Sequence, residues 1–293
     1  MKKIGMIGIG MMGHGIASNI VKHGYPLTVL AHAGNQPLDQ LVAAGTAICQ
    51  TPKALAATAE VIILCVTGTP QVEAVLTGED GVLQGLRPGT IIIDCSTAVP
   101  SSTVNVARAV EAAGGQFLDA PMTRTPKEAA EGRLNLLVGG DAALFAICKP
   151  ILECFAENIT HAGPVGAGHR MKLLHNYVSL GTVALLAEAA ASAQVAGIDA
   201  ATFVNVLATG GGWGAALERL KPFLATGDTS GLRFSIANAK KDLSYYNAMA
   251  TDSQVDKTIA QAVLQTLDQA AELATPQTLM PELIPMIAAR AKH

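Results

Sequence analysis

The amino-acid sequence predicts an α/β fold in which a doubly wound, mostly parallel sheet is followed by an all-helical domain. Two observations support this prediction. Short apolar runs alternate with segments of helical length up to Gly163, as expected of parallel strands joined by crossover helices. Beyond Gly163 the strand-like runs stop, and the rest of the chain is rich in alanine and leucine. We therefore expect one domain at residues 1–163 and a helical domain at residues 164–293.

The first strand, Ile4 to Ile7, runs directly into a glycine-rich turn, Gly8-Ile9-Gly10-Met11-Met12-Gly13. A G-x-G-x-x-G sequence between a strand and a helix is the dinucleotide-binding fingerprint of Rossmann-like domains. Gly8 permits the tight turn, Gly10 lets the backbone approach a pyrophosphate, and Gly13 lets the helix pack closely on the strand. The first domain is therefore expected to bind a dinucleotide at the start of this helix.

The later elements continue the alternation. Continuous apolar runs at Val61–Val66 and Thr90–Asp94 are typical of parallel strands buried on both faces. Further strands are expected at Leu27–Ala31, Ala47–Cys49, Phe117–Ala120, Leu134–Val138 and Asn158–His161. Helices are expected at Pro37–Ala44, Thr69–Leu76, Pro100–Ala113 and Ala142–Phe155, and in the second domain between breaks at Gly210–Gly212, Gly227–Gly231 and Pro276.

A polar face lies within the apolar segment from Gly166 to Ile198. Lys172, His175, Asn176 and Ser179 are spaced so that all four lie on one side of a helix. A lysine on a buried helix needs a partner or a purpose, because desolvating an ammonium group costs several kcal/mol. A solvent-facing stripe on an amphipathic helix is the commoner explanation of such spacing, but the glycine-rich turn at the other end of the chain favours a functional site.

The composition narrows the class of protein. The chain has 293 residues and a net charge of −3, without a basic tract, which argues against nucleic acid as a partner. We expect no signal peptide and no membrane span, because glycines break the N-terminal apolar stretch and the longest apolar run carries polar residues. Five cysteines without C-x-x-C spacing indicate reduced thiols in a cytoplasmic protein, and no residue cluster has the spacing of metal ligands.

The end of the second strand bears on the choice of cofactor. It reads Val29-Leu30-Ala31-His32-Ala33-Gly34-Asn35, without the carboxylate that would bind the ribose 2′-hydroxyl of NAD. NADP is therefore favoured, with NAD remaining possible, and His32 and Asn35 are candidate contacts of the 2′-phosphate. A solvated loop histidine explains His32 equally well.

Further motifs follow in order along the chain. They are Ile93-Asp94-Cys95-Ser96-Thr97-Ala98-Val99-Pro100, Asp119-Ala120-Pro121, Gly166-Ala167-Gly168, Lys172 with Asn176, and Phe234 with Lys241-Asp242-Leu243. With the opening glycine-rich turn, they resemble the β-hydroxyacid dehydrogenase family, which includes 3-hydroxyisobutyrate dehydrogenase. The resemblance extends from Ile4 to about Leu243 and does not specify a substrate.

The resemblance implies a role for several residues. Lys172 would be the catalytic acid and base, and Asn176 would position the substrate. The cofactor would be contacted by Met11, Met12, Val66, Thr97 and Lys241. Plainer explanations are a strand terminus for Val66, a helix cap for Thr97 and a surface charge for Lys241.

The expected substrate loop departs from the family pattern. Met122-Thr123-Arg124-Thr125 replaces the usual Val-Ser-Gly-Gly, and His175 stands where asparagine is typical. The Arg-Thr pair is similar to the sulfolactaldehyde reductase branch, and an arginine fork suits a sulfonate, a phosphate or a carboxylate. Alternatively, Arg124 points to solvent or pairs with Glu128 or Glu131. Expected substrate-binding residues are Thr123, Arg124, Thr125, His175 and Ser179.

These features predict reversible hydride transfer between a nicotinamide and a small 3-hydroxy acid or its aldehyde, by an NADP(H)-preferring dehydrogenase or semialdehyde reductase. A sulfolactaldehyde reductase-type enzyme that uses NADH is the alternative. An imine reductase, which often carries Asp or Tyr in place of Lys172, and a non-catalytic dinucleotide-binding protein are less favoured. By analogy with the family we expect a homodimer or homotetramer with a small anionic substrate.

Overall fold

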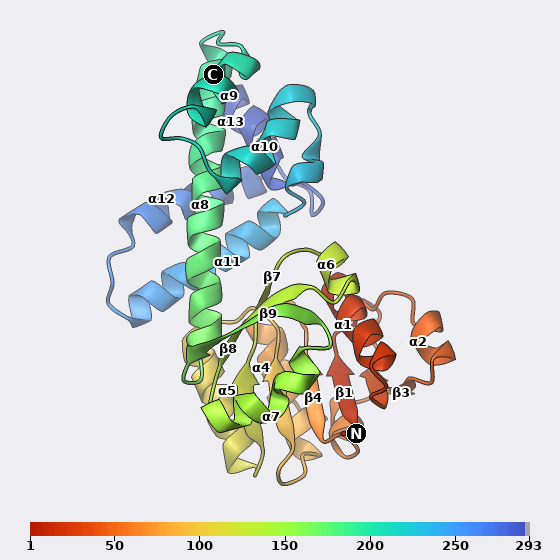
Figure 1. The fold of residues 1–293 in the computed structure, drawn as a ribbon. Coiled ribbons are helices and arrows are strands. Elements are labelled where there is room, and N and C mark those ends of the chain that lie inside the picture. Colours follow the sequence, from red (N-terminus) through yellow and green to blue (C-terminus); the bar gives the residue numbers. More distant parts are fainter. Residues whose placement is uncertain (291–293) are drawn as a thin grey trace. The chain divides into compact units, whose positions relative to one another are not determined.

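The structure, a computed structural model, describes residues 1–290. The chain divides into two compact units, Met1–Lys172 and the part that begins at Leu173. Helix α8 (Ala167–Val195) is continuous across this boundary (Figure 1). Each unit is described separately below.

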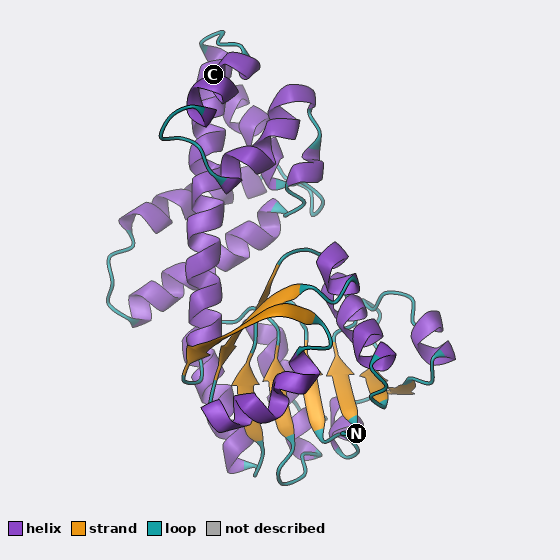
Figure 2. Cartoon of the chain, viewed as in Figure 1, coloured by secondary structure: helices purple, strands orange, loops and turns teal. Residues whose placement is uncertain are grey.

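The first unit is built on a nine-stranded sheet, whose strands are orange in Figure 2. The strand order is β3-β2-β1-β4-β5-β6-β8-β7, and β9 also pairs with β8. Neighbours from β3 to β6 in this order are parallel, β8 is antiparallel to β6 and β7, and β9 is parallel to β8. The strands are β1 (Ile4–Ile7), β2 (Leu27–Leu30), β3 (Ala47–Cys49), β4 (Val61–Leu64), β5 (Ile91–Asp94), β6 (Gln116–Asp119), β7 (Met122–Thr123), β8 (Leu134–Gly139) and β9 (Ala156–Gly163). This order confirms the predicted doubly wound, mostly parallel sheet.

The sheet is buried on both faces, which explains the continuous apolar runs. In β4, Val61 and Ile63 belong to one core cluster, whereas Ile62 and Leu64 belong to another, and all four side chains are fully buried. Successive side chains of a strand point to opposite faces, so each cluster lies on its own side of the sheet. The helices of this unit are α1 (Met11–Lys22), α2 (Asp39–Ala43), α3 (Pro52–Ala56), α4 (Thr69–Thr77), α5 (Pro100–Ala112), α6 (Pro126–Ala130) and α7 (Ala142–Leu152), with the 3-10 helix η1 (Val82–Gln84).

In the described part of the second unit, helices joined by loops are the only regular elements, apart from one isolated bridge between Ser235 and Leu279. This confirms the predicted all-helical second domain. Its elements after α8 are α9 (Ala200–Ala208), α10 (Ala215–Thr226), η2 (Thr229–Gly231), α11 (Ile236–Asp252), α12 (Thr258–Ala271), η3 (Met280–Glu282) and α13 (Leu283–Arg290). Among the described helices, α8 is the one that is long and apolar enough to cross a membrane. Core helices of soluble proteins share this length and composition, so one such helix is weak evidence for a membrane span.

Candidate functional site

The glycine-rich turn between β1 and α1 combines tight packing with one open position. Gly8 has a φ of 97°, and a Cβ atom there would lie 2.3 Å from the carbonyl oxygen of Cys65. A Cβ on Gly13 would lie 2.0 Å from the carbonyl oxygen of Gly8, so both positions require glycine. At Gly10, by contrast, a Cβ would meet no atom within 4 Å. Gly10 therefore leaves its space to a ligand.

The start of α1 is suited to an anion. Gly10 occupies the N-cap and supplies no side-chain cap, and the first turn contains no acidic residue. Met11 is 68% exposed, and Met12 is half-buried against the core of the unit. Uncapped amides at a helix N-terminus attract phosphate groups. The residues present therefore fit the pyrophosphate of a dinucleotide.

The two polar side chains after β2 differ in their contacts. The amide of Asn35 accepts a hydrogen bond from the N–H of Ile9 at 3.3 Å and donates one to the carbonyl oxygen of Leu30 at 2.9 Å. Asn35 thus ties the end of β2 to the glycine-rich turn. His32 is exposed, and its Nδ1 accepts from the N–H of Gly34 at 2.9 Å, which leaves Nε2 for a ligand.

The loops after β4 and β5 are joined through Ser96. The N–H of Val66 donates to the hydroxyl of Ser96 at 3.0 Å, and the N–H of Ser96 donates to the carboxylate of Asp94 at 2.9 Å. Thr97 follows and is half-buried. It is not the cap of α5, because that helix has Val99 at its N-cap. Val66 and Thr97 therefore lie in loops at the carboxyl ends of adjacent parallel strands, where doubly wound folds bind ligands.

The polar face of α8 is only partly buried. Lys172 is 9% exposed and Asn176 5% exposed, whereas Ser179 is half-buried and His175 is exposed. The first two side chains lie one turn apart on the same helix. Because Lys172 and Asn176 are both buried, these two residues are not part of a solvent-facing stripe.

Asn176 is held on both sides of its amide. Its Nδ2 donates to the carboxylate of Asp242 on α11 at 2.5 Å, and its Oδ1 lies 2.9 Å from Nδ1 of His175. An amide oxygen only accepts, so Nδ1 of His175 is the donor in this contact. Asp242 is 3% exposed, and its other oxygen lies 3.4 Å from Nζ of Lys241. One N–H of the Asn176 amide remains for a further partner.

The segment that begins at Thr123 contains two polar side chains, the hydroxyl of Thr123 and the guanidinium of Arg124, and both make hydrogen bonds within the first unit. The Thr123 hydroxyl accepts from the amide of Asn135 at 3.1 Å. Arg124 has a φ of 82°, in the left-handed region. Its Nη1 donates to the carbonyl oxygen of Arg133 and to the carboxylate of Glu157 on β9. The acidic partner of Arg124 is therefore Glu157, not Glu128 or Glu131.

Thr125 has a local structural role. Its side chain caps α6 in a capping box with Glu128, whose carboxylate accepts from the Thr125 hydroxyl and from the Thr125 N–H. This hydrogen bonding lowers the pKa of Glu128. The Thr125 hydroxyl is thus already used within the loop, and Thr123 and Arg124 are left as the residues of this segment that can serve a ligand.

Comparison with known proteins supports a single family. Residues 3–163 match the family model of the NAD binding domain of 6-phosphogluconate dehydrogenase, and residues 166–285 match a second family model, described as NAD-binding of NADP-dependent 3-hydroxyisobutyrate dehydrogenase. The NAD-dependent L-serine dehydrogenase of Pseudomonas aeruginosa is 35% identical over 76% of this chain and 74% of that protein. The chain belongs to the β-hydroxyacid dehydrogenase family. It is an NAD(P)-dependent oxidoreductase of that family.

Other relatives agree with this assignment. The 2-(hydroxymethyl)glutarate dehydrogenase of Eubacterium barkeri is 32% identical over 82% of this chain and 80% of that protein. The structure of Mycobacterium tuberculosis 3-hydroxyisobutyrate dehydrogenase with L-serine aligns over 98% of this chain and 99% of that one, with a TM-score of 0.87 and 25% identity. An imine reductase from Myxococcus stipitatus with NADP+ has a TM-score of 0.61 at 18% identity over 96% and 98% of the two chains, and shares the fold alone.

Three buried residues of this dehydrogenase were not predicted as site residues. Asp242 orients Asn176, as described above. The carboxylate of Asp119 accepts hydrogen bonds from the N–H groups of Gly166 and His169, at 2.7 and 2.8 Å, and so caps the start of α8. His169 itself is fully buried. Both aspartates belong to the motifs quoted for the family resemblance, which was the available signal, whereas His169 carried none.

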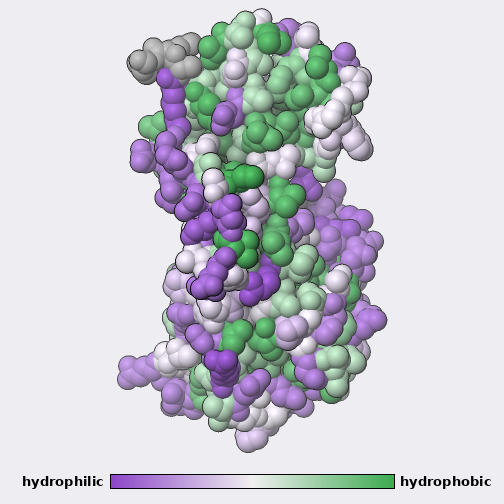
Figure 3. Space-filling model, turned by 90° about the vertical axis from the view of Figure 1, so that its left-hand side faces the viewer, coloured by the Kyte–Doolittle hydropathy of each residue, from purple (hydrophilic) through white to green (hydrophobic). Residues whose placement is uncertain are grey.

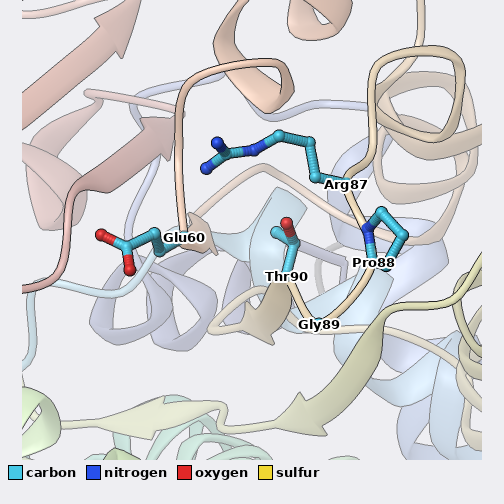
Figure 4. Close-up of a pocket in the computed structure, with 5 residues that line it drawn as sticks. All are labelled: Glu60, Arg87, Pro88, Gly89 and Thr90. Atoms are coloured by element: carbon cyan, nitrogen blue, oxygen red, sulfur yellow. The ribbon is translucent and has the colours of Figure 1, made fainter.

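An open hollow of about 350 Å³ lies elsewhere in the first unit. Figure 4 shows its lining residues, which come from the amino ends of β4 and β5 and the turn before β5: Glu60, Arg87, Pro88, Gly89 and Thr90. Glu60 accepts from the N–H of Lys3, and Arg87 donates to the carbonyl oxygen of Ala59 at 3.0 Å. The hollow lies at the amino ends of the parallel strands, whereas the glycine-rich turn lies at their carboxyl ends, where doubly wound folds bind ligands. We therefore assign it no part in the chemistry. Within residues 1–290, no group of three or more His, Cys, Asp or Glu side chains is arranged to hold a metal ion.

Proposed function

We propose that this family member is a β-hydroxyacid dehydrogenase or semialdehyde reductase that prefers NADP(H) and acts on a small 3-hydroxy acid or its aldehyde. The observation that carries the proposal is the buried Lys172, one helical turn from an Asn176 amide held by Asp242. A buried ammonium group is costly unless it is used or paired. The amide next to it keeps one N–H free to orient an oxygen atom.

In the oxidising direction, Nζ of Lys172 accepts the proton of the substrate hydroxyl while the carbinol carbon loses a hydride and becomes a carbonyl carbon. The nicotinamide cofactor supplies the two-electron acceptor when bound. In the reducing direction, Lys172 donates its proton to the developing alkoxide oxygen. Asn176 would hold this oxygen or the lysine in line, and Lys241 would contact the cofactor.

Thr123 and Arg124 would hold the anionic end of the substrate, with His175 and Ser179 contributing from α8. The Thr123 hydroxyl accepts from Asn135, so its own proton is available to a carboxylate or sulfonate oxygen. Relatives named for L-serine and 2-(hydroxymethyl)glutarate fit a small substrate with a hydroxyl near a carboxylate. A sulfonate substrate remains the second candidate, and Arg124 is the feature that favours it.

The preference for NADP rests on the segment after β2. No carboxylate stands there to bind a ribose 2′-hydroxyl, and the exposed His32 offers Nε2 to a 2′-phosphate. Asn35 is held in place by its two hydrogen bonds to backbone groups, which leave one N–H of its amide over. Asn35 and His32 therefore both stay candidate contacts of the 2′-phosphate.

The test is steady-state oxidation of NADPH and NADH against methylmalonate semialdehyde, succinic semialdehyde, tartronate semialdehyde, glyoxylate and sulfolactaldehyde. Preference for a carboxylate semialdehyde with NADPH supports the proposal. Preference for the sulfonate with NADH supports the second candidate instead. Binding of a dinucleotide without turnover of any aldehyde or hydroxy acid would show that the protein is not an enzyme of this kind.

We also propose that the protein is a cytoplasmic homodimer or homotetramer that associates through its helical unit. Val178 and Leu185 on α8 are 66% and 69% exposed, and Ile259 on α12 is 71% exposed. A Cβ on Gly181 would lie 3.8 Å from a methyl carbon of Val263, so the two helices lie side by side here. Figure 3, seen from the side on which α12 lies in Figure 1, shows apolar surface on this unit. Light scattering should show a monomer for Leu185→Glu and an oligomer for the parent protein.

A further inference from the structure

His169 in the first turn of α8 is fully buried and carries no role in the chemistry proposed above. Both of its ring nitrogens have partners. Nδ1 lies 2.8 Å from the hydroxyl of Thr103 on α5, and Nε2 lies 3.2 Å from the carbonyl oxygen of Ser96. The ring therefore joins three separate parts of the first unit: the loop after β5, helix α5 and the start of α8.

The directions of these hydrogen bonds are constrained. A carbonyl oxygen only accepts, so Nε2 of His169 carries the proton that is shared with Ser96. The Thr103 hydroxyl lies 3.2 Å from the carbonyl oxygen of Val99 as well as next to Nδ1, and can donate to either. A side chain that replaces this imidazole must span both partners, which few residues can do.

Two buried carboxylates flank the ring. Oδ2 of Asp94 lies 3.9 Å from Nε2, and Oδ2 of Asp119 lies 3.8 Å from Nδ1. Asp119 caps α8, whereas Oδ2 of Asp94 has no hydrogen-bond partner within residues 1–290. Burial raises the pKa of Asp94, and the nearby His169 opposes this shift. The imidazole therefore lies between two carboxylates: Asp94, which accepts from the N–H of Ser96, and Asp119, which caps the start of α8.

These contacts place His169 between the two halves of the proposed chemistry. The carbonyl oxygen of Ser96 accepts the hydrogen bond from Nε2 of His169, and the hydroxyl of Ser96 accepts one from the N–H of Val66. Ser96 also immediately precedes Thr97. Val66 and Thr97 are the proposed cofactor contacts of these loops. On the other side, Lys172 follows His169 by three residues and shares its face of α8. One ring thus connects the cofactor loops to the turn that carries the catalytic lysine.

We infer that His169 is a positioning residue that fixes the spacing between the loops carrying Val66 and Thr97 and the first turn of α8, and thereby the placement of Lys172 for proton transfer. This inference rests on the proposed dehydrogenase function. Because the ring is fully buried and both of its nitrogens have protein partners, we expect its loss to act on the rate of the chemical step and not on ligand binding. Misplacement of a reacting group by about 1 Å costs on the order of 100-fold in rate.

The experiment compares His169→Ala, His169→Gln and the parent enzyme. His161→Gln is the matched control, because His161 is also a histidine of this unit that bonds a backbone carbonyl, that of Gly140, at 2.8 Å. Single-turnover hydride transfer from NADPH, its deuterium isotope effect, the Kd for NADPH from fluorescence and the Tm are measured for each. A glutamine amide can still donate to Ser96, so His169→Gln tests rescue.

We expect His169→Ala to slow hydride transfer by about 10- to 100-fold with a change of less than about 3-fold in Kd. His169→Gln should recover part of this loss, and His161→Gln should leave the rate unchanged. If His169→Ala does not fold, Thr103→Val, which removes the hydroxyl and keeps the side-chain shape, should slow hydride transfer in the same direction.

Folded His169 or Thr103 variants with parental hydride-transfer rates would overturn the inference while leaving the dehydrogenase function intact. A rate loss that is matched by an equal loss of folded protein would also overturn it, because the role would then be structural only. If the parent enzyme turns over no aldehyde of the panel, the proposed function itself fails and the inference falls with it.

Discussion

Replacement of Lys172 by methionine separates the chemical role of the ammonium group from the packing of its stem. Lys172→Met keeps an unbranched apolar side chain on α8 and removes only the group that can transfer a proton. A positioned general acid or base contributes about 100- to 10,000-fold to rate. We therefore expect kcat to fall within this range, in both directions of the reaction, while the Kd for NADPH stays within about 3-fold.

The same substitution should not lower stability. Lys172 is 9% exposed, so the parent protein keeps most of an ammonium group away from water. Replacement of buried charged groups by apolar side chains of similar volume is often neutral or stabilising, by about 1–4 kcal/mol. The loss of the polar interaction that Lys172 makes offsets part of this gain. We expect a free energy of unfolding equal to that of the parent or about 1 kcal/mol higher.

The assay pairs steady-state and single-turnover kinetics with thermal unfolding, and Lys240→Met is the control. Lys240 is a lysine of α11 that pairs with Asp268 at 3.0 Å and is 45% exposed, so its loss should change neither rate nor Tm by much. Lys172→Met that retains more than about a tenth of the parental kcat would remove Lys172 as the acid and base. A loss of activity together with a large loss of stability would make Lys172 a structural residue instead.

Four further substitutions test other parts of the site. Gly10→Ala should fold normally, because its Cβ meets open space, and should raise the Kd for NADPH about 10-fold or more. Gly8→Ala should instead lower the stability of the protein, because its Cβ would clash with the carbonyl oxygen of Cys65. Parental NADPH affinity in Gly10→Ala, measured by fluorescence, would place the pyrophosphate elsewhere. Asp242→Asn should lower kcat about 10-fold, because an amide in its place can turn the Asn176 amide away from the substrate. An unchanged kcat would show that the orientation of Asn176 does not matter. Arg124→Gly should raise KM for the true substrate. It should leave Tm unchanged or higher, because a φ of 82° favours glycine. An unchanged KM would show that Arg124 does not bind the substrate.

Sequence patterns identified the elements whose physical signal is local. The run from Val61 to Val66 shows a strand because burial on both faces demands apolar residues at every position. Helices α3 and α6 were not predicted, because each spans only five residues and a helical period is barely visible over that length. Helix α2 is equally short but was predicted within the longer segment Pro37–Ala44. Strand β7 was missed because two residues are too few to show an alternation, and β9 begins at Ala156, two residues before the predicted strand at Asn158.

The candidate site shows the same division between local and distant information. Lys172 and Asn176 could be paired from their spacing, since a helix alone brings residues four apart to one face. Asp242 lies 66 positions from its partner Asn176, and Ser96 lies 73 positions from its partner His169. Such contacts depend on tertiary folding, which no periodicity in one sequence reveals. The partner of Arg124 was unpredictable in the same way, because Glu157 is brought to it by the pairing of β8 with β9.

The ion pair between Arg124 and Glu157 decides how this chain would hold an anion. Both hydrogen bonds of the guanidinium use Nη1, and among the described residues Nε and Nη2 have no partner. A guanidinium carries five N–H donors, so three remain for a carboxylate or sulfonate. Glu157 thus orients the fork and, through its charge, also competes with the substrate for it.

Glu157→Gln distinguishes these two effects. A glutamine oxygen still accepts the Nη1 hydrogen bond, so the orientation of Arg124 survives while the competing charge is lost. Because Glu157 is 48% exposed, the gain is modest, and we expect KM for the anionic substrate to fall by about 2- to 5-fold at low salt and less at high salt. An increase in KM would mean that the charge of Glu157 is needed to hold the fork. An unchanged KM at every salt concentration would mean that Arg124 does not contact the substrate, and the choice between carboxylate and sulfonate would then rest on Thr123.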